Sequence, residues 1–200
     1  MKLATIINGG AYLPALIDDE RMLRLDAVAP SMQALIEGGP EMLDAVRAHV
    51  AHAAPGDWTA VGQARFAPPV PRPGKFVCVG LNFRDHAAEG GHPIPEYPAL
   101  FLRTATSLAA HEEAVTLPRL SSKLDYEAEV VVVIGKACKK VDEASALSHV
   151  FGYTVFNDIS LRDYQKKSTQ WTAGKNFDRT GPTGPAIVTA EEVPGGGAGL

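Results

Sequence analysis

The first quarter of the chain contains two kinds of hydrophobic spacing. Residues 3–25 hold short apolar segments separated by turn residues at 8–10 and 18–20, which predicts a meander of three strands. Helical spacing follows on either side of Gly38 and Gly39, so we expect two helices there, with Pro40 at the start of the second. The apolar positions with this spacing are Met32, Leu35, Ile36, Leu43, Val46 and Val50.

A proline-rich segment over residues 55–74 follows these helices. Pro68, Pro69, Pro71 and Pro73 favour an extended, semi-rigid backbone. We therefore expect a domain boundary near this segment. It would separate a small N-terminal domain with its linker, residues 1–70, from a main domain, residues 71–200.

Beyond the boundary, apolar residues gather in short runs. Runs at 76–80, 99–104 and 152–158 predict strands, the first of them buried, and residues 142–149 have helical spacing. The run at 130–134 is continuous and rich in β-branched residues. Runs of this kind are typical of strands buried on both faces.

Acidic residues flank two of these strands. Glu127 and Glu129 are two positions apart, so their side chains project to the same face of the strand. Two carboxylates at the start of a buried strand repel each other and lose hydration, which a hard divalent metal ion compensates. The alternative is that both acids lie in solvent before the strand becomes buried. Asp158 is similarly either an acid near a helix N-terminus or a third oxygen ligand.

Four further residues have a possible chemical role and an ordinary alternative. His86 and Glu89 are three positions apart and would be neighbours on a helical turn, where they could activate water or form a solvated turn. Arg103 lies at the end of a predicted strand, where it could bind a substrate carboxylate or simply be exposed on the surface. Lys175, in an aromatic and glycine-containing setting, could stabilise an oxyanion or lie exposed.

Composition narrows the class of protein. The 200 residues are 46% hydrophobic and 21% charged, which is typical of a globular domain with a real core. The net charge is -4 and no run of Lys or Arg forms a basic stripe, so we expect no nucleic-acid partner. Cys78 and Cys138 are far apart and lack metal-ligand spacing, which favours free thiols. Without a signal-length or membrane-length apolar segment, we expect a cytoplasmic protein without a membrane partner.

From Phe76 to Val188, over half of the chain, the sequence resembles the fumarylacetoacetate hydrolase family. The motifs are specific in combination. They are Gly80-Leu81-Asn82-Phe83 with His86 and Glu89, Asp125-Tyr126-Glu127-Ala128-Glu129, Gly152-Tyr153-Thr154 with Asn157-Asp158 and Arg162-Asp163, and Gly174-Lys175 with Asp178 and Gly184-Pro185. The N-terminal segment is also similar to the small variable domain that many members carry.

This resemblance implies a site for Mg²⁺ or Mn²⁺ made by Glu127, Glu129 and Asp158. Three hard oxygen ligands suit either ion and leave positions for water and substrate. The ion would hold the 2-oxo and carboxylate oxygens of an acylpyruvate-like substrate.

The resemblance also implies roles for the remaining site residues. His86, oriented by Glu89, would take a proton from water so that hydroxide attacks the distal carbonyl. Lys175 and Gln165 match positions that contact the substrate or the developing oxyanion, and Arg103 is a looser match for a substrate ligand. The reaction implied is cleavage of a carbon–carbon bond with release of pyruvate.

As a fold class, the resemblance implies an α+β, β-rich structure: a mixed β-sheet roll with a small N-terminal α/β appendage, assembled as a homodimer. The implied activity is a metal-dependent hydrolase of 2,4-dioxo acids in aromatic catabolism. Alternatives are a 2-oxo acid decarboxylase, isomerase or hydratase of the same family, or a catalytically silent binding protein. Family members continue beyond the position of Leu200 with more strands and a Thr-Gly-Thr-Pro-type loop, so we expect a form truncated at the C-terminus.

Overall fold

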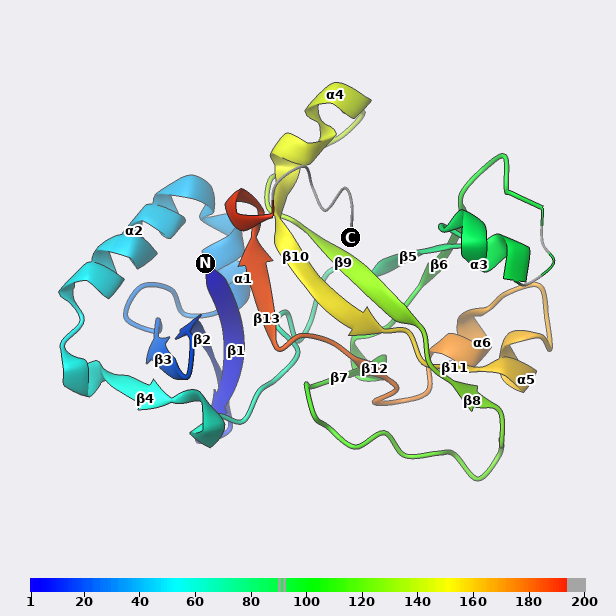
Figure 1. Cartoon of the computed structure of the whole chain (residues 1–200), viewed down its shortest axis with the longest axis horizontal. Helices are drawn as coiled ribbons and strands as arrows, with labels where there is room; N and C mark the ends of the chain where they lie inside the picture. Colours follow the sequence, from blue (N-terminus) through cyan, green and yellow to red (C-terminus); the bar gives the residue numbers. More distant parts are fainter. Residues whose placement is uncertain (90, 92, 194–200) are drawn as a thin grey trace.

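The structure is a computed structural model that describes residues 1–89, 91 and 93–193, and of residues 86, 87 and 89 only the backbone. Its largest sheet has seven strands, and neighbouring strands pair in the antiparallel direction (Figure 1). In sheet order they are β4 (Trp58–Ala60), β3 (Arg21–Arg24), β2 (Ala11–Asp18), β1 (Lys2–Asn8), β13 (Ala186–Thr189), β10 (Val150–Asn157) and β9 (Ala128–Ile134).

Three pairs of short strands complete the β-structure of the described residues. They are β5 (Val77–Gly80) with β6 (Ala99–Leu102), β8 (Leu124–Asp125) with β11 (Ser160–Leu161), and β7 (Leu108–Ala109) with β12 (Gly181–Pro182). Only the last of these pairs is parallel in the part of the chain that the structure describes. The prediction of a β-rich α+β fold is confirmed.

The helices of the described ranges are short apart from one. They are α1 (Met32–Glu37), α2 (Gly39–His52), α3 (Arg84–Glu89), α4 (Glu143–Ala146), α5 (Arg162–Gln165) and α6 (Thr172–Lys175). Single 3₁₀ turns lie at Pro55–Asp57, Val61–Gln63, Ala105–Ser107, Leu147–His149 and Ala190–Glu192. No helix among the described residues has the length and apolarity needed to cross a lipid bilayer.

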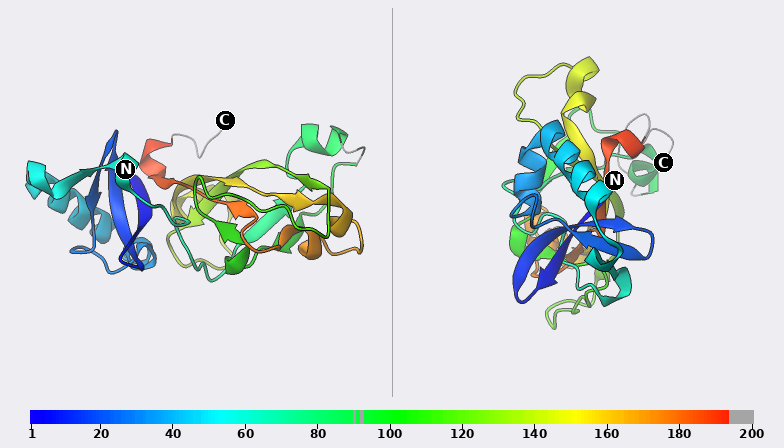
Figure 2. Two further views of the ribbon diagram at one scale, coloured as in Figure 1. Left: turned by 90° about the horizontal axis from the view of Figure 1, so that it is seen from below. Right: turned by 90° about the vertical axis from the view of Figure 1, so that its left-hand side faces the viewer.

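The N-terminal segment folds as its hydrophobic pattern predicts. β1, β2 and β3 form the antiparallel meander, and α1 and α2 follow it. Ser31 caps α1 by accepting a 3.1 Å hydrogen bond from the N–H of Ala34. Pro40 occupies the first turn of α2, where its missing N–H has no helical partner to lose. Figures 1 and 2 show both helices against one face of the N-terminal strands.

One hydrophobic core joins the N-terminal segment to the strands near the C-terminus. Leu3 of β1 lies opposite Ile187 of β13, and both are fully buried. Phe151 of β10 packs in the same cluster as Leu16 and Val46 of the N-terminal segment. The sheet therefore continues across the predicted boundary near residue 70, and the boundary itself remains a prediction.

The strand at 130–134 differs from its prediction. Along β9, half-buried and exposed side chains alternate, and Val130, Val132 and Ile134 are 48%, 48% and 54% exposed. The expectation of burial on both faces is wrong, because every second side chain of β9 is exposed. Among the described strands, β9 is an edge strand that pairs with β10. The prediction of a buried strand at β5 is wrong as well, because Val77 and Val79 are exposed.

Candidate active site

The backbone of β9 and β10 brings two of the predicted acids together. Phe156 of β10 lies opposite Glu129 of β9. Beyond the ends of both strands, the N–H of Asp158 donates a 2.9 Å hydrogen bond to the carbonyl of Glu127. The side-chain oxygen of Asn157 accepts a 3.1 Å hydrogen bond from the N–H of Glu127. The strand pairing thus fixes Glu127 and Asp158 side by side.

Lys175 is the cation between these two acids. Its Nζ donates hydrogen bonds of 2.8 Å to Glu127 Oε2 and 2.7 Å to Asp158 Oδ2. The side chain is only 2% exposed, and its Nζ lies 5.2 Å from the centre of the Phe101 ring. An ammonium group can be buried in this way because the carboxylates compensate its lost hydration.

Two arginines flank the acids. Arg162 donates to Glu127 Oε1 at 2.6 Å and to Asp125 Oδ2 at 2.9 Å. Arg103 is fully buried, and its Nε lies 3.1 Å from Asp158 Oδ1. Positive and negative groups therefore alternate along one chain of ion pairs, here called the charge chain, which consists of Arg162, Glu127, Lys175, Asp158 and Arg103.

The pKa values of the two carboxyl groups of the charge chain are shifted in opposite directions. Burial opposes the ionisation of Glu127, but Lys175 and Arg162 outweigh it and hold the pKa of this carboxyl below its ordinary value. Burial raises the pKa of Asp158 above its ordinary value, although Lys175 and Arg103 act against this rise. Asp158 Oδ1 and Arg103 Nε are buried without a hydrogen-bond partner, because their contact is not aligned for one. Asp158 thus has an acceptor oxygen that a bound cation would satisfy.

Two glycines allow the elements around Lys175 to pack closely. A Cβ on Gly174 would lie 2.4 Å from the backbone nitrogen of Gln165, so only glycine lets α6 approach α5 in this way. A Cβ on Gly80 would lie 2.0 Å from the ring of Trp171. The glycines therefore help to bring Lys175 to the acids.

A cavity of about 860 Å³ opens beside the charge chain, between β5, the start of β9 and the α5–α6 region. Five of the predicted site residues line it: Glu127, Glu129, Asp158, Gln165 and Lys175. Phe101 and Trp171 add aromatic walls. A site of this kind, apolar in part with convergent charged groups, is typical of a pocket for a small molecule.

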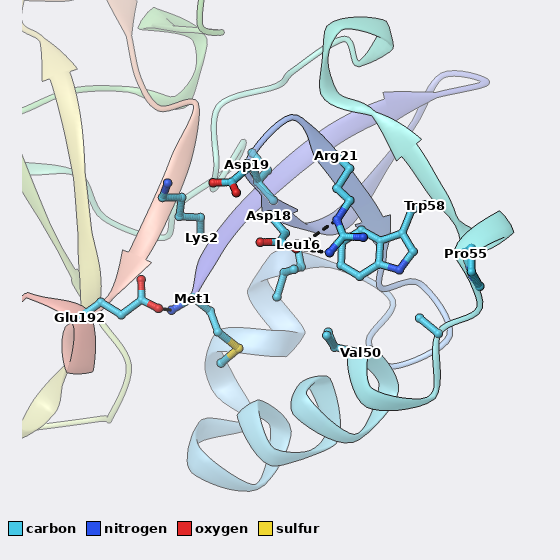
Figure 3. Close-up of a pocket in the computed structure, with 12 residues that line it drawn as sticks. Met1, Lys2, Leu16, Asp18, Asp19, Arg21, Val50, Pro55, Trp58 and Glu192 are labelled. Atoms are coloured by element: carbon cyan, nitrogen blue, oxygen red, sulfur yellow. Dashed lines mark hydrogen bonds and ion pairs between the residues drawn. The ribbon is translucent and has the colours of Figure 1, made fainter.

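A second cavity, of about 590 Å³, lies in the N-terminal segment between the strands and α2 (Figure 3). Two pairs of its charged groups contact each other: Arg21 contacts Asp18 at 2.6 Å and lies over the Trp58 ring, and the Met1 amine lies 2.5 Å from Glu192. None of the predicted site residues lines this cavity. The cavity beside the charge chain is therefore the candidate active site.

The acids suit a hard divalent cation by their chemistry. Glu127, Glu129 and Asp158 supply carboxylate oxygens to the wall of one cavity, and one oxygen of Asp158 is buried without a hydrogen bond. In the described part of the chain, no three acidic, histidine or cysteine side chains form a ready cluster for a metal ion. Lys175 lies between Glu127 and Asp158 and donates a hydrogen bond to each.

The remaining predicted residues lie in different surroundings. The backbone of His86 and Glu89 belongs to α3, and their side chains lie outside the described residues. Arg103 donates to the carbonyl of Thr180 at 3.1 Å as well as facing Asp158, and its contact with a substrate stays a prediction.

Sequence reasoning assigned no role to Arg162, which contacts two acids and Gln165. Its three-residue separation from Gln165 is the pattern that could have indicated the contact.

Comparisons with known proteins identify relatives of this chain. Residues 75–199 match the family model described as fumarylacetoacetate (FAA) hydrolase C-terminal. A protein of Burkholderia ambifaria (strain MC40-6) named "Putative hydrolase" is 41% identical over 197 residues, which are 97% of this chain and 68% of that protein.

Solved structures share the fold. The 5-carboxymethyl-2-hydroxymuconate delta-isomerase from Mycobacterium smegmatis is 28% identical with a TM-score of 0.71, over 95% of this chain and 67% of that one. Maleylpyruvate hydrolase from Sphingobium sp. SYK-6, in complex with manganese(II) and pyruvate, has a TM-score of 0.79 over 97% of this chain and 69% of that one. At 23% identity, this second likeness is one of fold alone.

Proposed function

Because this chain belongs to the fumarylacetoacetate hydrolase family, we propose that it is a metal-dependent hydrolase that cleaves a carbon–carbon bond in 2,4-dioxo acids. The proposed substrate class is acylpyruvates and fumarylpyruvate, and the proposed metabolic setting is aromatic catabolism. The observation that carries the proposal is that Glu127 and Asp158 both bind the same cationic group, Lys175. All three residues line a cavity of about 860 Å³.

Glu127, Glu129 and Asp158 are the proposed ligands of Mg²⁺ or Mn²⁺. When bound, either ion would polarise the 2-oxo and carboxylate oxygens of the substrate as a Lewis acid and fix its orientation. The buried Asp158 Oδ1, which lacks a hydrogen bond, supports a cation at this position.

Gln165 and Lys175 are the proposed donors to the substrate. The side-chain oxygen of Gln165 accepts a 3.1 Å hydrogen bond from Arg162, which leaves its NH₂ group to donate into the cavity that Gln165 lines. The ammonium group of Lys175 can stabilise negative charge that develops on an oxygen of the substrate. Both residues therefore favour a substrate rich in carbonyl and carboxylate oxygens, and Arg103 remains a proposed further substrate ligand.

His86 is the proposed general base, oriented by Glu89. Both belong to α3, which follows β5, and residues of β5 line the cavity. An imidazole takes a proton from water most effectively when its pKa is near the operating pH, which is usual for histidine. The water would then attack the carbonyl carbon next to the bond that breaks.

Isomerisation is the second candidate activity, because the M. smegmatis relative is named as an isomerase and is 28% identical. The homodimer is a further proposal, which a measurement of molar mass in solution would test against the chain mass of 21.2 kDa.

The test of the proposed function is a substrate panel. We expect the purified chain to release pyruvate from acetylpyruvate or fumarylpyruvate when Mg²⁺ or Mn²⁺ is present, and EDTA to stop the release. Pyruvate would be followed with lactate dehydrogenase and NADH, and all products by NMR. Movement of a double bond without pyruvate release would show that the chain is an isomerase and not a hydrolase. If no substrate is converted, both proposed activities are refuted.

A further inference from the structure

We propose that Lys175 is an internal cation that competes with the divalent metal ion, so that metal binding and withdrawal of Lys175 from Glu127 and Asp158 are a single coupled event. This inference rests on the proposed metal-dependent function. It adds a second role for Lys175, which holds the acids together before the metal ion binds.

Every carboxylate oxygen of Glu127 and Asp158 faces a cationic side chain. Glu127 Oε1 accepts from Arg162 at 2.6 Å and Glu127 Oε2 from Lys175 at 2.8 Å. Asp158 Oδ2 accepts from Lys175 at 2.7 Å, and Asp158 Oδ1 lies 3.1 Å from Arg103. A divalent cation can therefore reach both carboxylates only after at least one of these cationic groups has moved.

Lys175 is the cationic group that can leave with the smallest loss of other contacts. Arg103 also donates to the carbonyls of Thr180 and Ile159, and Arg162 also pairs with Asp125. Lys175 hydrogen-bonds to the two carboxylates themselves and, like them, lines the cavity. A flexible lysine can turn into the cavity by changes of side-chain rotamer, whereas a planar guanidinium held from several sides cannot.

Competition between two cations for the same carboxylates has reciprocal consequences. If Lys175 weakens metal binding by a given factor, metal binding weakens the contacts of Lys175 by the same factor. Removal of the lysine charge should leave Glu127 and Asp158 repelling each other, and a divalent cation relieves that repulsion. The metal-free variant should therefore be less stable than wild type, and its affinity for metal should be higher.

The experiment measures binding of Mn²⁺ alone by isothermal titration calorimetry and electron paramagnetic resonance. Lys175→Gln removes the charge and keeps a side chain of similar shape. Lys175→Arg keeps the charge and serves as the rescue variant. Lys166→Gln is the matched control, because Lys166 lines the same cavity and the change removes one charge from it without touching the two carboxylates.

We expect Lys175→Gln to bind Mn²⁺ about tenfold more tightly than wild type, within the usual range of coupling between two sites, with Lys166→Gln and Lys175→Arg close to wild type. If wild type binds Mn²⁺ and Lys175→Gln binds it no more tightly, the competition is overturned and the proposed function stands. If neither wild type nor the folded Lys175→Gln variant binds Mn²⁺, both the metal site of the proposed function and the competition are refuted.

A second measurement uses wild type and does not depend on the folding of any variant. Acetic anhydride acetylates accessible lysines, and mass spectrometry reports the rate at each position. Lys175 is buried, so it should react slowly in metal-free protein and several-fold faster at saturating Mn²⁺, while Lys166 keeps its rate. A rate at Lys175 that stays the same or falls on addition of Mn²⁺ would show that the lysine does not withdraw.

Discussion

The N–H of Asp158 donates a 2.9 Å hydrogen bond to the carbonyl oxygen of Glu127. This contact between main chains continues the antiparallel pairing of β9 and β10, so the two acids are neighbours through the fold of the backbone. The repulsion between their side chains is balanced by the cationic groups of the charge chain.

Glu127→Gln should abolish metal-dependent turnover. The variant keeps the shape of the side chain but removes the charge that would bind a divalent cation, and we expect a loss of about 100-fold or more in kcat/KM for pyruvate release. Glu143→Gln, an exposed site on α4, is the matched control and should retain wild-type activity. Full activity of Glu127→Gln would show that this carboxylate is not a ligand.

The ion pairs of Glu127 should make stability depend on pH. The pKa of Glu127 in the folded chain lies below its ordinary value of 4.5, because Lys175 and Arg162 outweigh the opposing effect of burial. Its ionised form thus stabilises the fold fully above that ordinary value, and this contribution is lost as the pH falls through the lowered pKa.

Urea unfolding of wild type and Glu127→Gln measures this effect. We expect a difference of about 3 kcal/mol near neutral pH, as is typical when one partner of a buried pair is removed. The difference should shrink in acid, below the lowered pKa of the folded state. A difference that stays constant across this range would contradict the lowered pKa.

Gly174→Ala should destabilise the site. Its Cβ would lie 2.4 Å from the backbone nitrogen of Gln165, and α5 and α6 would have to move apart. Overpacking of this kind costs about 1–3 kcal/mol, and the shift of Lys175 should also lower kcat/KM. Gly62→Ala is the control, because its Cβ would meet no atom within 4 Å. Equal melting temperatures for the two variants would argue against close packing of α5 and α6.

The two cysteines should differ in reactivity. Burial is the main cause that raises the pKa of Cys78 to about 12, whereas Cys138 is exposed. Near pH 8, a thiol reagent such as DTNB should therefore label one thiol quickly in the folded chain and two after unfolding. Cys138→Ser should remove the fast reaction. Fast labelling that persists in this variant would mean that Cys78 is accessible as a thiolate.

Several features of the fold and the site could be predicted because they depend on short stretches of sequence. Turn residues and apolar spacing fixed the meander of β1 to β3 and both N-terminal helices, and Ser31 and Pro40 mark where those helices begin. The alternation of side chains on a strand predicts that Glu127 and Glu129 face the same side, which stays a prediction, and both residues line the cavity.

The burial of individual strands could not be read in the same way. The run at 130–134 has the composition of a strand buried on both faces, but burial depends on what packs against the strand. In the structure, Val130, Val132 and Ile134 on one face of β9 are about half exposed. Composition indicates whether a strand is able to be buried. The elements that pack against the strand decide how far each of its faces is buried.

By itself, the sequence determined the local elements, the family and the set of polar residues available for a site. Only the tertiary structure decided that Lys175, 48 residues after Glu127, lies between that acid and Asp158. The physical reason is range: helix caps, turns and side-chain alternation act within a few residues, whereas a buried ion pair forms only where distant segments pack together and exclude water.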